Sequence, residues 1–164
     1  MALTGTYVPS KTQWVRENVE EYESSNGTRG TELNGFPVVV ITSVGAKSGN
    51  LRKNPVMRVE RDGTYVAIAS KGGAEDNPEW YHNLVAHPEV DLQDKGEMHT
   101  YVARVVEGDE RADWWQLAVD TWPTYAEYQK KTDRQIPVFL LERAWRRATT
   151  TFTAGRSSTS RRSC

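Results

Sequence analysis

The sequence predicts a mainly β, α+β fold: a six-stranded antiparallel sheet curled into a small barrel, with flanking helices. Short β-branched or alternating apolar runs between residues 37 and 141 are joined mostly by hairpin turns. Helical patterns interrupt these runs without separating them into parallel crossover units. The length of 164 residues fits one domain with one core. Six strands are enough to curl into a small barrel.

Six segments have the character of strands. They are residues 37–43, 51–60, 65–70, 90–92, 98–106 and 136–141. Pro55 interrupts the second segment, which predicts an edge strand or a bulge, because proline cannot donate to a β-ladder. Residues 61–64 and 94–96 have the composition of hairpin turns.

Four segments have the character of helices. The first covers residues 10–23, where Trp14, Val15, Val19 and Tyr22 form an apolar stripe. The second is predicted to have Asn77 as its cap and Pro78 in its first turn, and to end at residues 87–88. The third begins after residues 108–109 and carries Ala112, Trp115, Ala118 and Val119 on one side. The fourth is indicated by Thr124 and Glu127, which have the spacing of a capping box.

The chain therefore divides into a polar arm with one helix (residues 1–35), the barrel (residues 36–144) and a basic tail rich in Ser and Thr (residues 145–164). The tail has five arginines and no acid, and its composition predicts disorder. The rest of the chain is acidic, which argues against a nucleic-acid partner. The single cysteine, Cys164, predicts a cytoplasmic protein, and no stretch resembles a signal peptide or a membrane span.

The first candidate site is the segment Gly45-Ala46-Lys47-Ser48-Gly49, followed by Arg52 and Lys53. Glycine amides, a hydroxyl and up to three cations are the groups that bind a phosphate. The segment is not a nucleotide-triphosphate loop, because the glycines of that motif are missing. The alternative interpretation is a solvated hairpin turn.

The second candidate is Ala69-Ser70-Lys71-Gly72-Gly73, at the exit of a predicted strand. Paired glycines let a ligand approach the backbone closely, and Lys71 adds a charge. The alternative is a flexible connection between a strand and a helix.

The third candidate comprises Trp122, Tyr125 and Tyr128, which recur every three residues. Such a wall could stack on a planar ring, and a tyrosine hydroxyl could donate a proton. Ordinary packing is the alternative. No metal site is predicted, since His82, His87 and His99 lack metal-ligand spacing.

These segments together resemble the deazaflavin-dependent nitroreductases of actinobacteria. The resemblance rests on residues 42–49, 52–55, 69–75, 77–84, 122–128 and 132–137, in that order. It implies an FMN-binding-like split β-barrel whose cofactor is reduced 8-hydroxy-5-deazaflavin, coenzyme F-420. The implied reaction is hydride transfer to a small quinone or nitroaromatic substrate. Some relatives have membrane-associating arms, so a peripheral contact with the inner face of the cell membrane stays open.

The resemblance also assigns residues to the site. The anionic tail of the cofactor would lie against Ala46, Lys47, Ser48, Arg52 and Lys53. The deazaflavin ring would be framed by Asn54, Pro55, Val56, Met57, Ile68, Ala69, Ser70, Lys71, Glu79, Trp80, Tyr81, His82, Asn83 and Tyr125. Ser70, Tyr125 and Tyr128 would face the substrate as catalytic residues. Two alternatives are an FMN-dependent reductase of the same fold and a deazaflavin carrier without catalytic activity.

Overall fold

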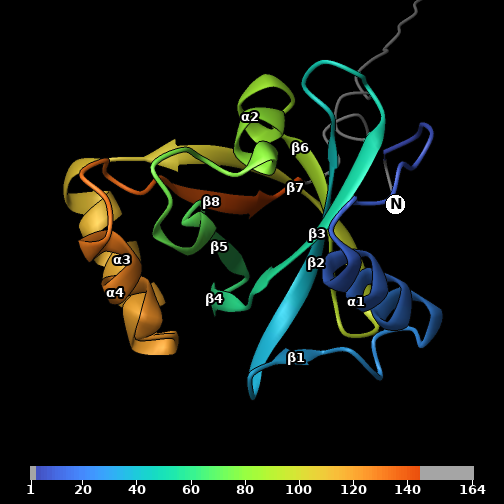
Figure 1. Ribbon diagram of the computed structural model, residues 1–164, viewed down its shortest axis with the longest axis horizontal. Coiled ribbons are helices and arrows are strands. Elements are labelled where there is room, and N and C mark those ends of the chain that lie inside the picture. The colour runs from blue at the N-terminus through green and yellow to red at the C-terminus, as the bar shows by residue number, and fades with distance from the viewer. Residues whose placement is uncertain (1–2, 145–164) are drawn as a thin grey trace, which may run out of the picture.

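A computed structural model of the chain describes residues 3–144 (Figure 1). The elements are α1 (Gln13–Ser24), β1 (Glu32–Leu33), β2 (Phe36–Val44), β3 (Leu51–Met57), β4 (Val59–Arg61), β5 (Thr64–Ile68), the 3-10 helix η1 (Lys71–Gly73), α2 (Glu79–Ala86), β6 (Glu89–Asp94), β7 (Glu97–Val106), α3 (Gly108–Thr121), α4 (Thr124–Lys130) and β8 (Val138–Arg143). The tail for which disorder is predicted, residues 145–164, lies outside the described residues.

The strands form one curled, antiparallel sheet. Their order is β1-β2-β6-β7-β8-β5-β4, and β3 pairs with the edge of β2 that faces away from β6. The mainly β, antiparallel prediction with flanking helices is confirmed, but the count of six strands is wrong, because the described part of the chain has eight. One added strand is the short β1. The other arises because the segment 51–60 divides into β3 and β4 at Arg58.

The division at Arg58 gives the sheet its barrel-like curl. Met57, at the end of β3, pairs with Val38 of β2, whereas Val59, at the start of β4, pairs with Val66 of β5. One continuous segment thus supplies both ends of the strand order, and the sheet must bend round to bring them together. Pro55 lies within β3, where a missing N–H is tolerated because β3 is an edge strand, as the sequence predicts.

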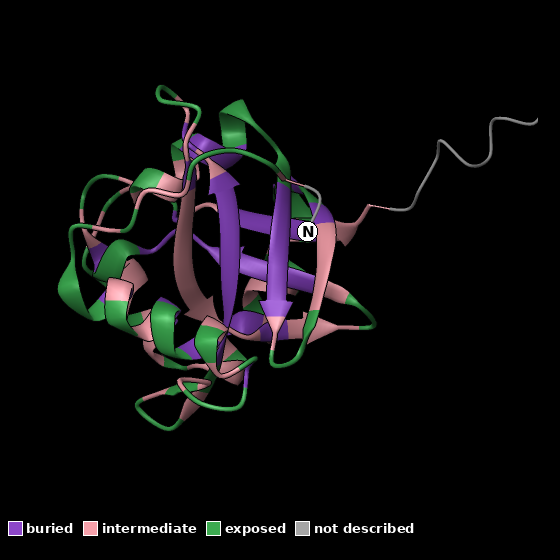
Figure 2. Ribbon diagram, turned by 90° about the vertical axis from the view of Figure 1, so that its right-hand side faces the viewer, coloured by how far each residue is buried: buried purple, intermediate pink, exposed green. Residues whose placement is uncertain are grey.

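Many strands are apolar on both faces because both faces of the sheet are covered. Odd-numbered residues such as Val39, Ile41 and Phe139 form the interior of the curled sheet, which α2 closes with Leu84. Even-numbered residues of β2, Val38 and Val40, face outward under α1. The outer face of β5 and β8 is likewise covered, by α3 and α4. Buried strands therefore lie at the centre, with partly exposed helices around them (Figure 2).

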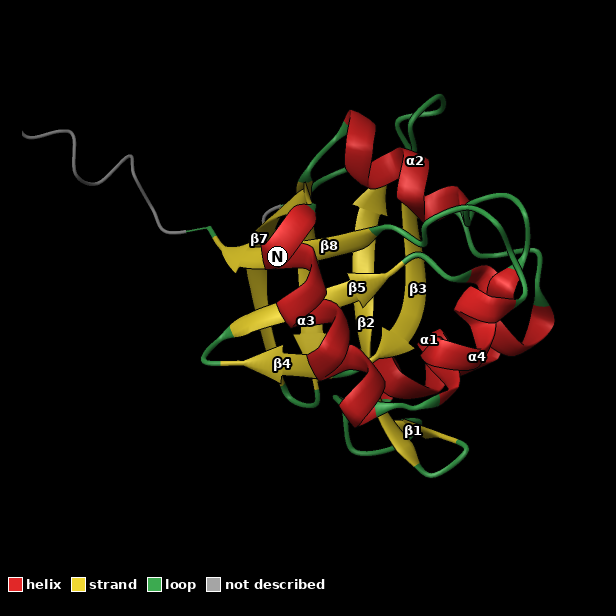
Figure 3. Ribbon diagram, turned by 90° about the vertical axis from the view of Figure 1, so that its left-hand side faces the viewer, coloured by secondary structure: helices red, strands yellow, loops and turns green. Residues whose placement is uncertain are grey.

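The helices occupy different sides of the sheet. Figure 1 shows α1 on the side of β2 and β3, with α3 and α4 on the opposite side and α2 at one end. Figure 3 shows α3 lying across the sheet near β5 and β8. Val15, Val19 and Tyr22 of α1 are buried as predicted, but Trp14 is 54% exposed. On α3, Ala118 is buried, and Ala112 of the predicted apolar side is exposed.

Two predicted helix caps are wrong. The cap of α2 is Pro78 and makes no side-chain capping bond, because the Asn77 amide oxygen instead accepts a hydrogen bond from Arg134 Nη1 at 2.7 Å. The cap of α4 is Pro123, and Thr124 lies inside the helix, so no capping box forms. Within residues 3–144, no helix combines the length and apolar character needed to cross a membrane.

Candidate functional site: a cationic groove beside α2

The loop between β2 and β3 is a compact turn that carries the first predicted site. The Gly45 N–H donates to the Asn50 carbonyl at 2.7 Å, and the Gly49 N–H donates to the Gly45 carbonyl at 3.0 Å. Gly49 has a φ of +74°, which favours glycine. A Cβ at Gly45 would lie 2.5 Å from Ser48 Oγ, so this position has no room for a side chain without movement of the serine.

Asn83 of α2 holds this loop against the helix. Its Oδ1 accepts a hydrogen bond from the Ala46 N–H at 2.9 Å, and its Nδ2 donates to Ser43 Oγ at 3.3 Å. Asn83 is buried, and its bond to Ser43 is buried with it, whereas its bond to Ala46 is partly buried at the edge of the cavity described next. The loop and the first turns of α2 are therefore joined into one wall.

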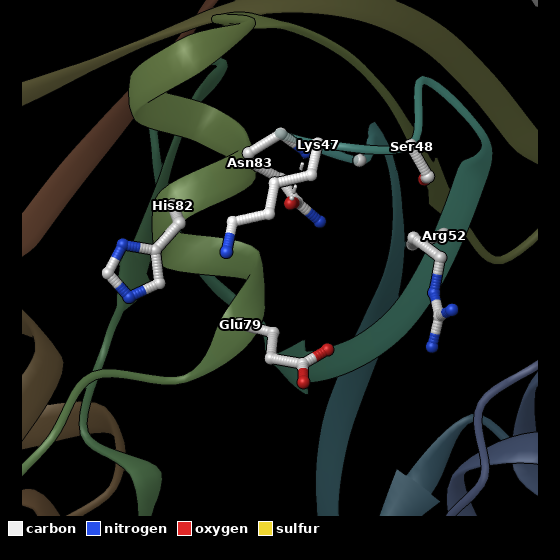
Figure 4. Close-up of a pocket in the computed structure, with 8 residues that line it drawn as sticks. Lys47, Ser48, Arg52, Glu79, His82 and Asn83 are labelled. Atoms are coloured by element: carbon white, nitrogen blue, oxygen red, sulfur yellow. Dashed lines mark hydrogen bonds between the residues drawn. The ribbon is translucent and has the colours of Figure 1, made fainter.

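A cavity of about 460 Å³ lies between the loop and α2 (Figure 4). Its lining consists of Gly45, Ala46, Lys47, Ser48, Arg52, Glu79, His82 and Asn83. Figure 4 shows Glu79, His82 and Asn83 projecting from α2, with Arg52 across the cavity on the neighbouring strand. All of these except Gly45 are among the residues predicted to bind a cofactor.

A second cavity of about 600 Å³ continues from the first, because both are lined by Arg52, Glu79 and Asn83. Its other lining residues are Ser10, Lys11, Thr12, Trp14, Val15, Asn54, Pro55, Lys71, Pro78 and Trp80. The two cavities together are called the groove below. Its lining thus comes from the segment before α1, from α1, β3, η1 and α2, and from the loop between β2 and β3.

Three cations of the groove, Lys11, Lys47 and Arg52, have no carboxylate partner among residues 3–144. Within residues 3–144, neither Lys47 nor Arg52 forms an ion pair, whereas Lys71 Nζ lies 2.9 Å from Asp76 Oδ2. An anion bound between Lys47 and Arg52 would therefore not compete with a carboxylate already paired to them. Among the residues that the structure describes, Glu79 is the one acidic residue of the groove, and it lies where the two cavities meet, so the space beside it is less favourable for an anion.

The structure does not bring Lys53 together with Lys47 and Arg52. Successive side chains of a strand point to opposite faces, so Lys53 turns away from Arg52. Its ammonium group pairs with Glu23 of α1 and lies 4.8 Å from the centre of the Tyr7 ring. The Lys53 side chain is only 11% exposed and lines neither cavity.

The residues predicted to frame a ring divide into two groups. Asn54, Pro55, Lys71 and Trp80 line the larger cavity, Glu79 and Asn83 line both cavities, and His82 lines the smaller one. The remainder face the protein interior or its edge: Val56, Ile68, Ala69 and Tyr81 belong to or pack against the core clusters, Met57 packs beneath α1, and Ser70 is buried.

The residues of the predicted aromatic wall do not share one helix, because Trp122 is the C-cap of α3 and only Tyr125 and Tyr128 lie on α4, but their rings pack together. Tyr125 is 4% exposed, and its ring lies 5.0 Å from Trp122 and 6.5 Å from Tyr128, centre to centre. Burial raises the pKa of the Tyr125 phenol, so the hydroxyl stays protonated. Neither Tyr125 nor Tyr128 lines the groove. The helix does touch the second predicted site, since a Cβ at Gly73 would lie 2.8 Å from the Tyr128 carbonyl oxygen.

Sequence reasoning missed the contribution of the arm to the groove. Lys11 and Trp14 line the larger cavity, and the half-exposed Trp14 stands at the edge of an otherwise buried stripe. A large aromatic residue next to Lys11 at the start of a helix was the only signal for this role. Among residues 3–144, no cluster of three or more potential metal ligands occurs.

Comparison with known proteins identifies the family. The sequence model of the family described as F420H(2)-dependent quinone reductase matches residues 14–143. An F420H(2)-dependent quinone reductase of Mycobacterium tuberculosis is 32% identical over 135 residues, which cover 80% of this chain and 91% of the relative. A second from the same species, described as putative, is 30% identical over 105 residues, covering 64% and 88%.

Two solved structures share both sequence and fold with this chain. One, described as an F420-H2 dependent reductase, is 52% identical with a TM-score of 0.62, and the match covers 65% of this chain and 94% of that one. The other, described as a domain-swapped dimer, is 48% identical with a TM-score of 0.65, and covers 81% and 100%. The family match spans the curled sheet and all the described helices, so this chain belongs to the F420H(2)-dependent quinone reductase family.

Proposed function

We propose that this protein is an oxidoreductase that binds reduced coenzyme F-420 in the groove and delivers its hydride to a quinone. The observation that carries the proposal is the unequal lining of the groove. Lys47, in the smaller cavity, and Arg52, where the two cavities meet, present unpaired positive charge, while Pro55 and Trp80 present apolar surface in the larger cavity. A cofactor with an anionic tail and a flat ring requires this combination.

The residues of the groove fit that cofactor. We assign the anionic tail to Lys47, Ser48 and Arg52, with Ala46 and Asn83 shaping the loop, and we leave Lys53 out of this set because Glu23 neutralises it. Asn54, Pro55, Trp80 and Lys71 border the space proposed for the ring. When bound, the deazaflavin supplies the hydride, and the protein supplies orientation and exclusion of water.

Ser70, Tyr125 and Tyr128 are proposed to face the acceptor. None of the three lines the groove, and the support is their proximity to Lys71, which does: Ser70 directly precedes Lys71, and α4 packs against η1. Burial raises the pKa of the Tyr125 phenol, so at neutral pH this group would act as a proton donor and not as a base. An FMN-binding-like split β-barrel accounts for the arrangement, because the curl of the sheet sets β3, β5 and α2 around the groove.

The deciding experiment is a fluorescence titration of the purified protein with coenzyme F-420 and, in parallel, with FMN. We expect binding of coenzyme F-420 at micromolar or lower concentration and markedly weaker binding of FMN. Oxidation of the reduced cofactor is then followed with a soluble quinone and with a nitroaromatic compound. Equal or tighter binding of FMN would contradict the cofactor assignment, and tight binding without turnover would identify a carrier.

A further inference from the structure

Arg134 lies outside the groove, yet its guanidinium group is bonded to the loop that follows β5. Its Nε donates to the Ala74 carbonyl at 2.9 Å, and its Nη2 lies within hydrogen-bond distance of the Ala69 and Ser70 carbonyls, at 3.2 and 3.1 Å. Its Nη1 donates to the Asn77 side chain at 2.7 Å. One side chain thus holds four oxygen atoms across residues 69–77, and a planar fork of donors suits such a task.

The loop held by Arg134 has an unusual backbone. Lys71, Gly72 and Gly73 have φ values of +46°, +65° and +87° in succession. A lysine in this left-handed region costs about 1 kcal/mol or more and persists only where the surroundings enforce it. Two local bonds hold the turn, from the Gly73 N–H to the Ser70 carbonyl at 2.9 Å and from the Ala74 N–H to the Lys71 carbonyl at 3.1 Å. The bonds from Arg134 to the Ser70 and Ala74 carbonyls flank these residues and add to that enforcement.

Arg134 is itself fixed from α4. Gln129 Nε2 donates to the Arg134 carbonyl at 2.7 Å, and Gln129 Oε1 accepts from the Ile136 N–H at 3.0 Å. The helix that carries Tyr125 and Tyr128 is therefore joined through Arg134 to the loop that carries Ser70 and Lys71.

The hydrogen bond to Ser70 has a consequence on the other side of the peptide. A trans peptide directs its C=O and N–H in opposite directions, so a Ser70 carbonyl aimed at Arg134 turns the Lys71 N–H away from it. Within residues 3–144 this N–H donates to no protein acceptor. Lys71 lines the larger cavity of the groove, whereas Arg134 lines a different cavity.

We propose that Arg134 is a positioning residue for the cofactor: it fixes the Ser70–Lys71 peptide so that the Lys71 N–H is offered to an acceptor atom of the bound ring. Arg134 touches neither cofactor nor substrate and acts through this peptide. The inference rests on the proposed function, because it takes the groove to hold the deazaflavin.

The test compares Arg134→Ala and Arg134→Lys with Arg111→Ala. Arg111 is a matched control, because it lines the same cavity as Arg134 and donates to the Ile136 carbonyl at 2.7 Å, but makes no hydrogen bond to residues 69–77. Hydrogen–deuterium exchange of the protein without cofactor reports on the loop. We expect faster exchange of the amides of residues 70–76 in Arg134→Ala, and wild-type exchange there in Arg111→Ala.

Cofactor binding gives the second readout. The dissociation constant for coenzyme F-420 should rise about tenfold or more in Arg134→Ala, less in Arg134→Lys, and little in Arg111→Ala. Millimolar guanidinium should restore part of the affinity of Arg134→Ala, which a merely unfolded variant would not show. If Arg134→Ala does not fold, Arg134→Lys decides the question, and wild-type affinity in that variant overturns the proposal.

Different results would overturn the proposed function and the positioning role of Arg134. Absence of coenzyme F-420 binding by the wild-type protein would overturn the proposed function. Unchanged exchange of residues 70–76 in a folded Arg134→Ala variant would overturn the positioning role, whatever the cofactor.

Discussion

Arg52 and Lys53 are adjacent in the sequence, but they face opposite sides of β3. Arg52 lines both cavities of the groove, and Lys53 pairs with Glu23 beneath α1. The residue types alone suggested one cluster of three cations. Strand alternation divides it, and this division could have been anticipated once residues 51–57 were taken as a strand. The pairing with Glu23 could not, because it depends on where α1 packs.

Lys47→Ala tests this division. Removal of an unpaired cation from the groove should raise the dissociation constant for coenzyme F-420 about tenfold and reduce its dependence on salt, because exposed attractions are screened within about 10 Å at 0.1 M. Lys53→Ala is the control, and its affinity should stay near the wild-type value. Fluorescence titrations at two salt concentrations measure both. Equal losses of affinity in the two variants would contradict the division.

Tyr125→Phe tests the proposed proton donor. If the hydroxyl protonates the acceptor, quinone turnover should fall roughly tenfold to a hundredfold while cofactor affinity changes little. Burial raises the pKa of this phenol above its ordinary value of 10.0, so its donor form is complete at neutral pH and would be lost only above the raised pKa. The Tyr125 contribution should therefore be constant between about pH 6 and 9.

Tyr101→Phe serves as the control for that measurement, since Tyr101 is a buried tyrosine in the interior of the curled sheet. It should turn over quinone at the wild-type rate. Wild-type turnover in Tyr125→Phe as well would leave Tyr125 a packing residue, as its contacts with Trp122 and Tyr128 already allow.

At the scale of elements, α2 and the loop between β2 and β3 act as a unit through Asn83. Asn83→Ala leaves the Ala46 N–H and Ser43 Oγ without their partner, which should lower the free energy of unfolding by about 1–3 kcal/mol. The released loop should also bind coenzyme F-420 more weakly. Urea denaturation and fluorescence titration measure the two effects.

Val85→Ala is the matched control on the same helix, because Val85 is largely exposed. It should change neither quantity by more than about 0.5 kcal/mol. A stable Asn83→Ala variant with wild-type affinity would show that the loop keeps its shape without the helix.

The sequence predicted the existence of the elements better than their ends. Apolar periodicity predicts α1, α3 and the long strands, because most residues of each stripe face the core, with Trp14 and Ala112 as exceptions. The fourth helix forms although the capping box that indicated it does not. Both predicted capping signals, Asn77 and Thr124, are wrong. The Asn77 amide oxygen accepts a hydrogen bond from Arg134, which lies 57 residues away in the sequence, so a long-range hydrogen bond replaces the local capping bond. No local pattern reports such competition.

At the scale of the whole molecule, the curl of the sheet could be predicted from the sequence, but the position of the break between β3 and β4 could not. The hairpin-linked runs predict an antiparallel barrel, yet they contain nothing that places the break at Arg58 instead of Pro55. The break is set by distant groups: Arg58 Nε donates to Asp94 Oδ2 at 2.8 Å, and the Tyr65 hydroxyl donates to the same carboxylate. Asp94 therefore ties the bend between β3 and β4 to β5 and β6.

Asp94→Ala should destabilise the fold, because it removes the shared acceptor of Arg58 and Tyr65. We expect a loss of about 2 kcal/mol or more in the free energy of unfolding. Asp113→Ala removes the partner of Arg61 in an exposed ion pair and should cost less than about 1 kcal/mol. Urea denaturation measures both variants. Similar losses of unfolding free energy in the two would mean that packing, and not Asp94, holds the break between β3 and β4.

The pairing of β5 with β8 also orders events while the chain is being synthesised. Tyr65 is paired with Leu141, and the loop after β5 is held by Arg134, so both supports are translated long after the residues they hold. The hairpin of β2 and β3 and the hairpin of β6 and β7 can form early from neighbouring residues. The ring end of the groove is instead completed only after β8 has been synthesised, so a nascent chain acquires its hold on the cofactor later than it can form these two hairpins.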